Sequence, residues 1–205
     1  KKQADKLVAD YKYVRSVPMG YSFYENKVTA IMNTENKSKY FMNNIILQLV
    51  TFYSYEDLKI VMFTNEENEK DWSYLKYTNH SFSNDKSIRF FATTNEDYKL
   101  LAEYFEQEVN YRASLEFKNN IPPKPYYLIV IDDYDRVKRY DFIKTITELD
   151  NNIGYSIVIL ENKMGNLPSK CNNFINLGAN SSGILKNSYE KQEQISKRNP
   201  PRSRP

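Results

Sequence analysis

Short, wholly apolar segments alternate along this chain with longer segments whose apolar residues recur at helical spacing. The clearest short segment is Tyr126–Ile131, a run of six apolar residues. Strands that are apolar on both faces are typical of a parallel sheet that is covered by helices on both sides. The alternation therefore predicts an α/β fold with a mostly parallel sheet, helices on both faces and right-handed crossovers.

The bounds of the expected elements follow from the two periodicities. Strands are expected at Val28–Met32, Leu58–Phe63, Ile88–Ala92, Tyr126–Ile131, Tyr155–Leu160 and Phe174–Leu177. Helices are expected at Lys1–Val14, Lys39–Tyr53, Asn95–Phe117 and Arg136–Leu149. The chain then divides into an N-terminal helix and linker (1–19), one α/β domain (20–185) and a basic, Pro-rich flexible tail (186–205).

Composition excludes several classes of function. Lys and Arg number 29 against 26 Asp and Glu, a net charge of +3, which is too near balance to favour nucleic acid as a partner. No apolar run approaches the roughly 20 residues of a membrane span. The single cysteine, Cys171, and the single histidine, His80, exclude a disulfide framework and a Cys- or His-rich metal site. We expect Cys171 to be a small buried side chain and His80 to be an ordinary packed or exposed one.

The apolar run Tyr126–Ile131 ends in Asp132 and Asp133. This is the form of a Walker B element, in which the carboxylate at the strand end holds magnesium and its neighbour polarises the attacking water. A structural interpretation stands beside it, because hydrophobic strands commonly end in an Asp that caps the next turn or helix.

The matching phosphate loop is defective. Its template is Gly, four residues, then Gly-Lys-Ser/Thr, and the corresponding segment Ile31–Ser38 keeps Lys37 and Ser38 but replaces both glycines. No glycine occurs between Tyr21 and Ile153. Glycine lets the loop adopt positive φ and wrap its N–H groups around phosphates. The sequence therefore indicates a loop that has lost competent ATP binding, in which Lys37 and Ser38 are vestigial or are ordinary residues of a helix start.

An aromatic cluster follows the polar segment 65–71. Its members are Trp72, Tyr74, Tyr77 and Phe82. Aromatic side chains dominate the energetics of protein interfaces, so Trp72, Tyr74 and Tyr77 could bind a partner. A small core beneath a long loop explains the cluster equally well.

Several segments together resemble a known family. Leu49–Ile60 is similar to the "QL-x-x-x-HS-x-DD-L-K" stretch of the FtsK/SpoIIIE-type membrane ATPases of type VII secretion, the EssC/EccC type. Asp71–His80 is similar to their "W-x-W-x-K-W-x-P-H". Glu106–Arg112 is similar to "E-M-E-R-R", and Gly154–Leu160 and Asn166–Cys171 to the strand and "LP-x-x-C" turn that follow. The resemblance covers about Val14 to Leu185 and departs at Tyr53, where the family often has His.

The resemblance implies the membrane-proximal cytosolic domain of such a motor, RecA/P-loop NTPase-like in fold with a degenerate nucleotide site. It implies a catalytically silent module, with no catalytic residues, metal or cofactor of its own. The module would couple the membrane segment to the tandem ATPase domains of the same chain and dock other secretion subunits at the cytoplasmic face of the cell membrane. The alternative is an active or nucleotide-gated NTPase that binds ATP and Mg²⁺ through Asp132–Asp133. A DNA translocase is disfavoured, because the chain has no basic stripe interleaved with aromatic residues.

Overall fold

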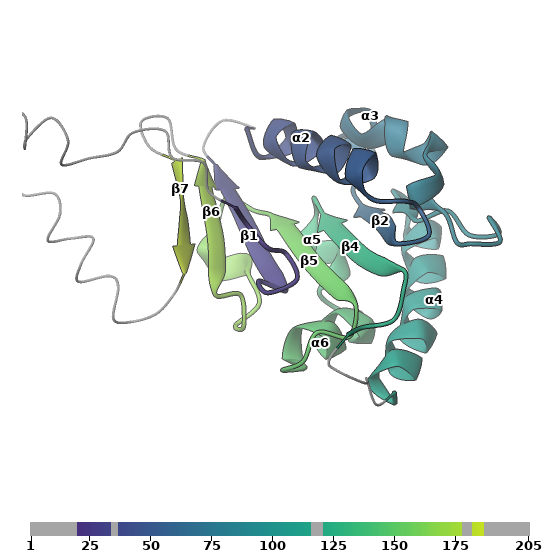
Figure 1. The fold of residues 1–205 in the computed structure, drawn as a ribbon. Coiled ribbons are helices and arrows are strands. Elements are labelled where there is room, and N and C mark those ends of the chain that lie inside the picture. Colours follow the sequence, from purple (N-terminus) through teal and green to yellow (C-terminus); the bar gives the residue numbers. More distant parts are fainter. Residues whose placement is uncertain (1–19, 34–36, 116–120, 178–181, 187–205) are drawn as a thin grey trace, which may run out of the picture.

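The computed structural model describes residues 20–33, 37–115, 121–177 and 182–186. Within them a seven-stranded sheet has the order β3-β2-β4-β5-β1-β6-β7 (Figure 1). The first six strands in sequence pair in parallel, and β7 is antiparallel to β6. The strands are β1 (Val28–Asn33), β2 (Leu58–Phe63), β3 (Phe91–Ala92), β4 (Tyr126–Ile131), β5 (Tyr155–Leu160), β6 (Asn173–Leu177) and β7 (Ser182–Lys186). The expected α/β class with a mostly parallel sheet is confirmed.

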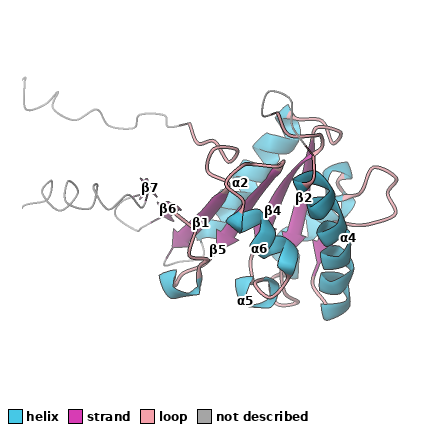
Figure 2. Ribbon diagram, turned by 90° about the horizontal axis from the view of Figure 1, so that it is seen from below, coloured by secondary structure: helices cyan, strands magenta, loops and turns pink. Residues whose placement is uncertain are grey.

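Helices cover both faces of the sheet, as expected (Figures 1 and 2). One face carries α2 (Lys37–Phe52), α3 (Glu69–Trp72) and the short 3-10 turn η1 (Ser73–Tyr77). The other carries α4 (Asn95–Ala113), α5 (Tyr134–Val137) and α6 (Asp141–Glu148). Two further 3-10 turns are η2 (Asn79–Ser81) and η4 (Met164–Asn166). No helix in the described ranges is long and apolar enough to cross a bilayer.

The strand residues divide between two cores because successive side chains point to opposite faces. Ile129 and Ile131 of β4 pack in the core beneath α4 and α6, whereas Leu128 and Val130 pack in the core beneath α2. All four are buried. A strand that is buried on both faces needs apolar residues at every position, which explains the uninterrupted run seen in the sequence.

The third expected strand, Ile88–Ala92, is reduced to the two residues of β3. The segment before β3 pairs with a loop instead. The amide of Phe90 donates to the carbonyl of Ser81 at 2.8 Å, and Arg89 forms an isolated antiparallel bridge with Phe82. These loop contacts take up the backbone groups that a longer parallel strand would use.

The helix expected at Arg136–Leu149 is two helices, α5 and α6, with Tyr140 between them in an extended conformation. In one continuous helix, Val137 and Phe142 would point about 140° apart. The break lets both side chains enter the same core, where each is at most 1% exposed.

The remaining differences between the expected and the observed elements concern the carboxyl end of α4 and the two ends of the chain. The helix that begins at Asn95 ends at Ala113, before the expected Phe117, and Phe117 itself lies outside the described residues. Strand β7 was not anticipated from the sequence. The helix predicted for Lys1–Val14 and nearly all of the predicted tail also lie outside the described residues and stay predictions.

Candidate functional site

A polar cleft of about 330 Å³ lies where β4 and β5 end and α2 begins. In doubly wound α/β sheets, ligands bind at the carboxyl ends of the strands. The cleft is lined by Ser38 and Lys39 from the start of α2, by Asp132, Asp133 and Asp135 after β4, and by Glu161 after β5. It is the position at which a P-loop enzyme would hold its nucleotide, and it carries more acidic than basic side chains.

Asp132 is held by hydrogen bonds from within the protein. Its side chain is 6% exposed, and its Oδ2 accepts from the indole Nε1–H of Trp72 at 3.0 Å and from the hydroxyl of Thr64 at 3.2 Å. Burial is the largest influence on this carboxyl and raises its pKa, although the hydrogen bond from Trp72 and the charge of Lys39 act in the opposite direction. The carboxylate is therefore hydrogen-bonded to neighbouring side chains and largely shielded from solvent.

Lys39 supplies the positive charge nearest to Asp132. Its Nζ lies 3.7 Å from Asp132 Oδ2 and 3.0 Å from Asp71 Oδ2. The ammonium group of Lys39 thus bridges two carboxylates, one buried and one at the surface. We call Lys39, Thr64, Asp71, Trp72 and Asp132 the carboxylate network.

Three members of this network were not anticipated from the sequence: Lys39, Thr64 and Asp71. Thr64 had a usable signal. It directly follows β2, and Phe63 is in register with Ile131, so the residues after these two parallel strands must lie side by side. Lys39 and Asp71 are far apart in sequence and meet only because α3 packs beside α2.

The first three positions of the phosphate-loop template belong to strand β1 rather than to a loop. Ile31 is fully buried in β1 and in register with both Leu160 and Ile175. Met32 and Asn33 continue the pairing with β6. Only residues 34–36 remain between β1 and α2, and they lie outside the described residues. In a competent P-loop, the backbone from the first glycine onward leaves the strand to wrap phosphate.

The predicted nucleotide-site residues come together only in part. Ser38, Asp132 and Asp133 line the same cleft, whereas Lys37 is exposed at the first position of α2. No cluster of three or more metal-ligating side chains occurs among the described residues. Within this cleft, Asp132 takes part in an internal ion pair and two hydrogen bonds.

The predicted partner-binding aromatics fall into different environments. Trp72 is fully buried in the core beneath α2, so its ring packs in a main core of the sheet rather than at the surface or in a separate small core. Tyr74 is half-buried, donates its hydroxyl to Asn43 Oδ1 at 2.6 Å, and has its pKa raised to about 12 by burial. Tyr77 is 85% exposed and stays a candidate for contact with a partner.

His80 and Cys171 behave as ordinary structural residues. The Nε2 of His80 lies 2.9 Å from the carbonyl oxygen of Tyr53, and its ring packs edge-on against Tyr55. Cys171 is 4% exposed, and burial raises the pKa of its thiol to about 11. A thiol with a raised pKa is a poor nucleophile at neutral pH, so the expectation of a small buried side chain is confirmed.

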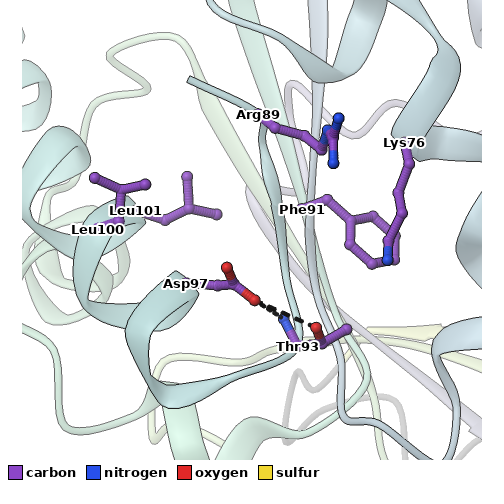
Figure 3. A pocket seen from close by; sticks show the side chains of 7 residues that line it. All are labelled: Lys76, Arg89, Phe91, Thr93, Asp97, Leu100 and Leu101. Atoms are coloured by element: carbon purple, nitrogen blue, oxygen red, sulfur yellow. Dashed lines mark hydrogen bonds between the residues drawn. The ribbon is translucent and has the colours of Figure 1, made fainter. Parts of the chain in front are cut away.

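A smaller hollow of about 150 Å³ lies beside β3 (Figure 3). Lys76 and Arg89 line one side of it, and Asp97 and the leucines of α4 line the other (Figure 3). Asp97 Oδ2 accepts from the amide of Thr94 at 2.9 Å, as part of the capping box that begins α4, and also from the amide and hydroxyl of Thr93 at 3.1 and 3.2 Å. The carboxylate in this hollow therefore serves the helix start.

Comparison with curated proteins finds relatives at low identity. The chain is 23% identical over 163 residues to an ESX secretion system protein EccC from Geobacillus thermodenitrificans, which covers 76% of the chain and 10% of that protein. It is 23% identical over 152 residues to the ESX secretion system protein YukB of Bacillus subtilis, covering 73% of the chain and 10% of that protein. The chain thus spans about a tenth of the length of these relatives. No family model matches it.

Solved structures share the fold. EssC (ATPases 2 and 3) from Geobacillus thermodenitrificans superposes with a TM-score of 0.56 and 12% sequence identity. The match covers 76% of this protein and 32% of the solved EssC chain. Thermomonospora curvata EccC (ATPases 2 and 3), solved in complex with a signal sequence peptide, matches 84% and 34% with a TM-score of 0.59 and 14% identity. Sequence and fold agree with the resemblance described above: the chain is similar in sequence to EccC-type secretion proteins and shares the fold of the solved EssC/EccC ATPase domains.

Proposed function

We propose that this domain is a non-hydrolysing, ATPase-like module of a type VII secretion motor. It couples the membrane segment of the motor to the tandem ATPase domains of the same chain, at the cytoplasmic face of the membrane, and docks other secretion subunits. The observation that carries the proposal is the carboxylate network, in which Trp72, Thr64 and Lys39 occupy the Walker B-like Asp132.

The carboxylate network supports the proposed absence of ATP hydrolysis for a physical reason. A Walker B carboxylate works by facing magnesium, directly or through water. Trp72 and Thr64 hold Asp132 through Oδ2, and a rotation of the carboxylate that broke these two hydrogen bonds would leave two buried donors unsatisfied, at about 1–3 kcal/mol each. Asp133, Asp135 and Glu161 line the same cleft and add negative charge where a polyphosphate would sit.

A docking role is supported by exposed aromatic side chains. Phe52 is 80% exposed, and Tyr53, Tyr55 and Tyr77 are also exposed, all at or beyond the carboxyl end of α2 or in η1. Isolated exposed aromatics are common, but a run such as Phe52, Tyr53 and Tyr55 favours a protein contact. The two solved structures each contain ATPases 2 and 3, which supports tandem ATPase domains as the partners within the motor.

Calorimetry with Mg-ATP tests the catalytic part of the proposal. The parent protein is titrated beside Asp133→Ala and Lys37→Ala. We expect no saturable heat from any of the three proteins. Saturable binding by the parent that is lost in both variants would establish the alternative, an active or nucleotide-gated NTPase that uses Asp132–Asp133 with ATP and Mg²⁺.

The docking part is tested in the complete motor protein in its own host. Phe52→Asp and Tyr77→Asp are expected to lower export of the secreted substrates, because a charge at an aromatic contact opposes its burial. Tyr111→Asp, at an exposed tyrosine of α4 on the other face of the sheet, is the matched control and should leave export unchanged. Normal export in both Asp variants would overturn the docking role of these two residues.

A further inference from the structure

An apolar groove of about 720 Å³ opens at the amino edge of the sheet, beneath the carboxyl end of α2. Its floor includes Leu49 of α2, Leu58 at the start of β2, and Tyr126 and Leu128 of β4. One wall is the segment Tyr21–Tyr24, which leads into β1. The groove is thus an extension of the core beneath α2 that reaches the surface.

The groove leaves apolar side chains uncovered within the described part of the chain. Ile121 is 68% exposed, and Tyr53 is 53% exposed, although both line the groove. The charged residues lining it, Asp57 and Lys124, are ion-paired with each other. A concave surface of this size with few polar groups gains free energy when an apolar segment covers it.

We infer that the N-terminal segment of the same chain, Lys1–Val14, docks in this groove as an amphipathic helix. The described chain begins at Gly20, and residues 21–24 form one wall of the groove, so only residues 15–19 separate the segment from the described chain beside the groove. The five residues 15–19 can span up to about 17 Å when extended. A fourteen-residue helix is about 21 Å long. The segment can therefore reach the groove without displacing any described element.

The sequence of the segment fits an apolar groove. Leu7, Val8, Tyr11 and Val14 fall on one face at helical spacing. The lysines and aspartates of the segment fall mostly on the remaining surface, which would face solvent. A single short amphipathic helix is marginal in water and is stabilised by burying its apolar face. Docking in the groove would supply that burial within the chain. The inference concerns a different surface from the carboxylate network and does not depend on the proposed function.

Hydrogen exchange measured by mass spectrometry on the 205-residue protein tests this inference. We expect the amides of residues 5–14 to exchange at least about tenfold more slowly in the parent than in Leu7→Asp, which charges the apolar face. Ala9→Asp places the same charge on the opposite face and serves as the matched control. It should keep the protection of the parent.

A groove-side variant separates docking from helix formation alone. Ile121→Asp changes an exposed groove residue and should remove the protection of residues 5–14 while the emission of the buried Trp72 stays unchanged. Absence of protection in the parent overturns the inference, and so does protection that survives Ile121→Asp. Protection that rises with protein concentration, together with a dimer in sedimentation, would assign the groove to a second copy and would also overturn it.

Discussion

The two ends of α2 cover opposite edges of the same sheet, and the chain treats them differently. At the amino end of α2, the Asp132 carboxylate of the polar cleft contacts other side chains of the protein, namely Trp72, Thr64 and Lys39. At the carboxyl end, the apolar groove stays open, with Ile121 and Tyr53 exposed along it. The Asp132 carboxylate at the carboxyl ends of the strands therefore has partners within the protein, whereas the groove at their amino ends exposes apolar side chains.

The contrast shows how an ATPase-like fold can persist without its ligand. A functional nucleotide site holds polar groups whose partners arrive with the ligand. Here the partners of Asp132 are side chains of α2 and α3 and the hydroxyl of Thr64, which directly follows β2.

The largest expected effect separates the buried aromatic from the exposed one. Trp72→Ala should lower the free energy of unfolding by about 3–5 kcal/mol, because it leaves a cavity beneath α2. Tyr77→Ala should stay within about 0.5 kcal/mol of the parent. Urea unfolding followed by circular dichroism measures both. Equal effects would break the division between a core residue and a surface residue.

A smaller effect is expected from the carboxylate itself. Asp132→Ala should cost about 1–3 kcal/mol, since the Trp72 and Thr64 donors lose their acceptor in a buried place. Asp132→Asn should cost less, because an amide oxygen still accepts both bonds and no charge is buried. The matched control is Asp133→Ala, whose carboxyl makes no capping hydrogen bond to α5. If the two alanine variants were equally harmless, the network would contribute nothing to stability.

The smallest expected effect is a difference between the pKa values of Asp132, in the polar cleft, and Asp57, beside the apolar groove, which NMR titration measures. The pKa of Asp132 is raised above its ordinary value of 3.8 by burial, so its contribution to stability falls as pH rises through that higher pKa. The pKa of Asp57, beside the groove, is lowered below 3.8 by its hydrogen bond from Lys124. Its contribution is present above pH 3.8 and is lost as pH falls through the lower pKa. The opposite order of the two midpoints would contradict this difference.

Much of the fold could be predicted because it rests on local periodicity. The runs Leu58–Phe63, Tyr126–Ile131 and Tyr155–Leu160 match β2, β4 and β5 at both ends. The failures come from contacts that are distant in sequence. Strand β3 is shorter than expected because the segment before it pairs with a loop. The expected helix Arg136–Leu149 is divided into α5 and α6, and the break places both Val137 and Phe142 in the same core.

The candidate site was predictable in its outline and not in its interior. The strand-end aspartates and the replaced glycines could be read directly from the chain. The full set of side chains that hold Asp132 could not: Thr64 directly follows a predicted strand, but Lys39 and Trp72 come from two helices whose packing is not evident from the sequence. Trp72 in particular combines an apolar body with one polar donor, so composition alone cannot distinguish a surface contact from a buried residue that donates a hydrogen bond.

The indole N–H of Trp72 gives the most direct test of the central claim. The chain has one tryptophan, so a ¹⁵N–¹H spectrum contains one indole signal, and that N–H donates to Asp132. We predict that millimolar Mg²⁺, ATP and Mg-ATP leave the signal in place, because the carboxylate stays with its internal partners. A saturable shift that requires Mg-ATP and disappears in Lys37→Ala would show that Asp132 serves a nucleotide site and would contradict the account.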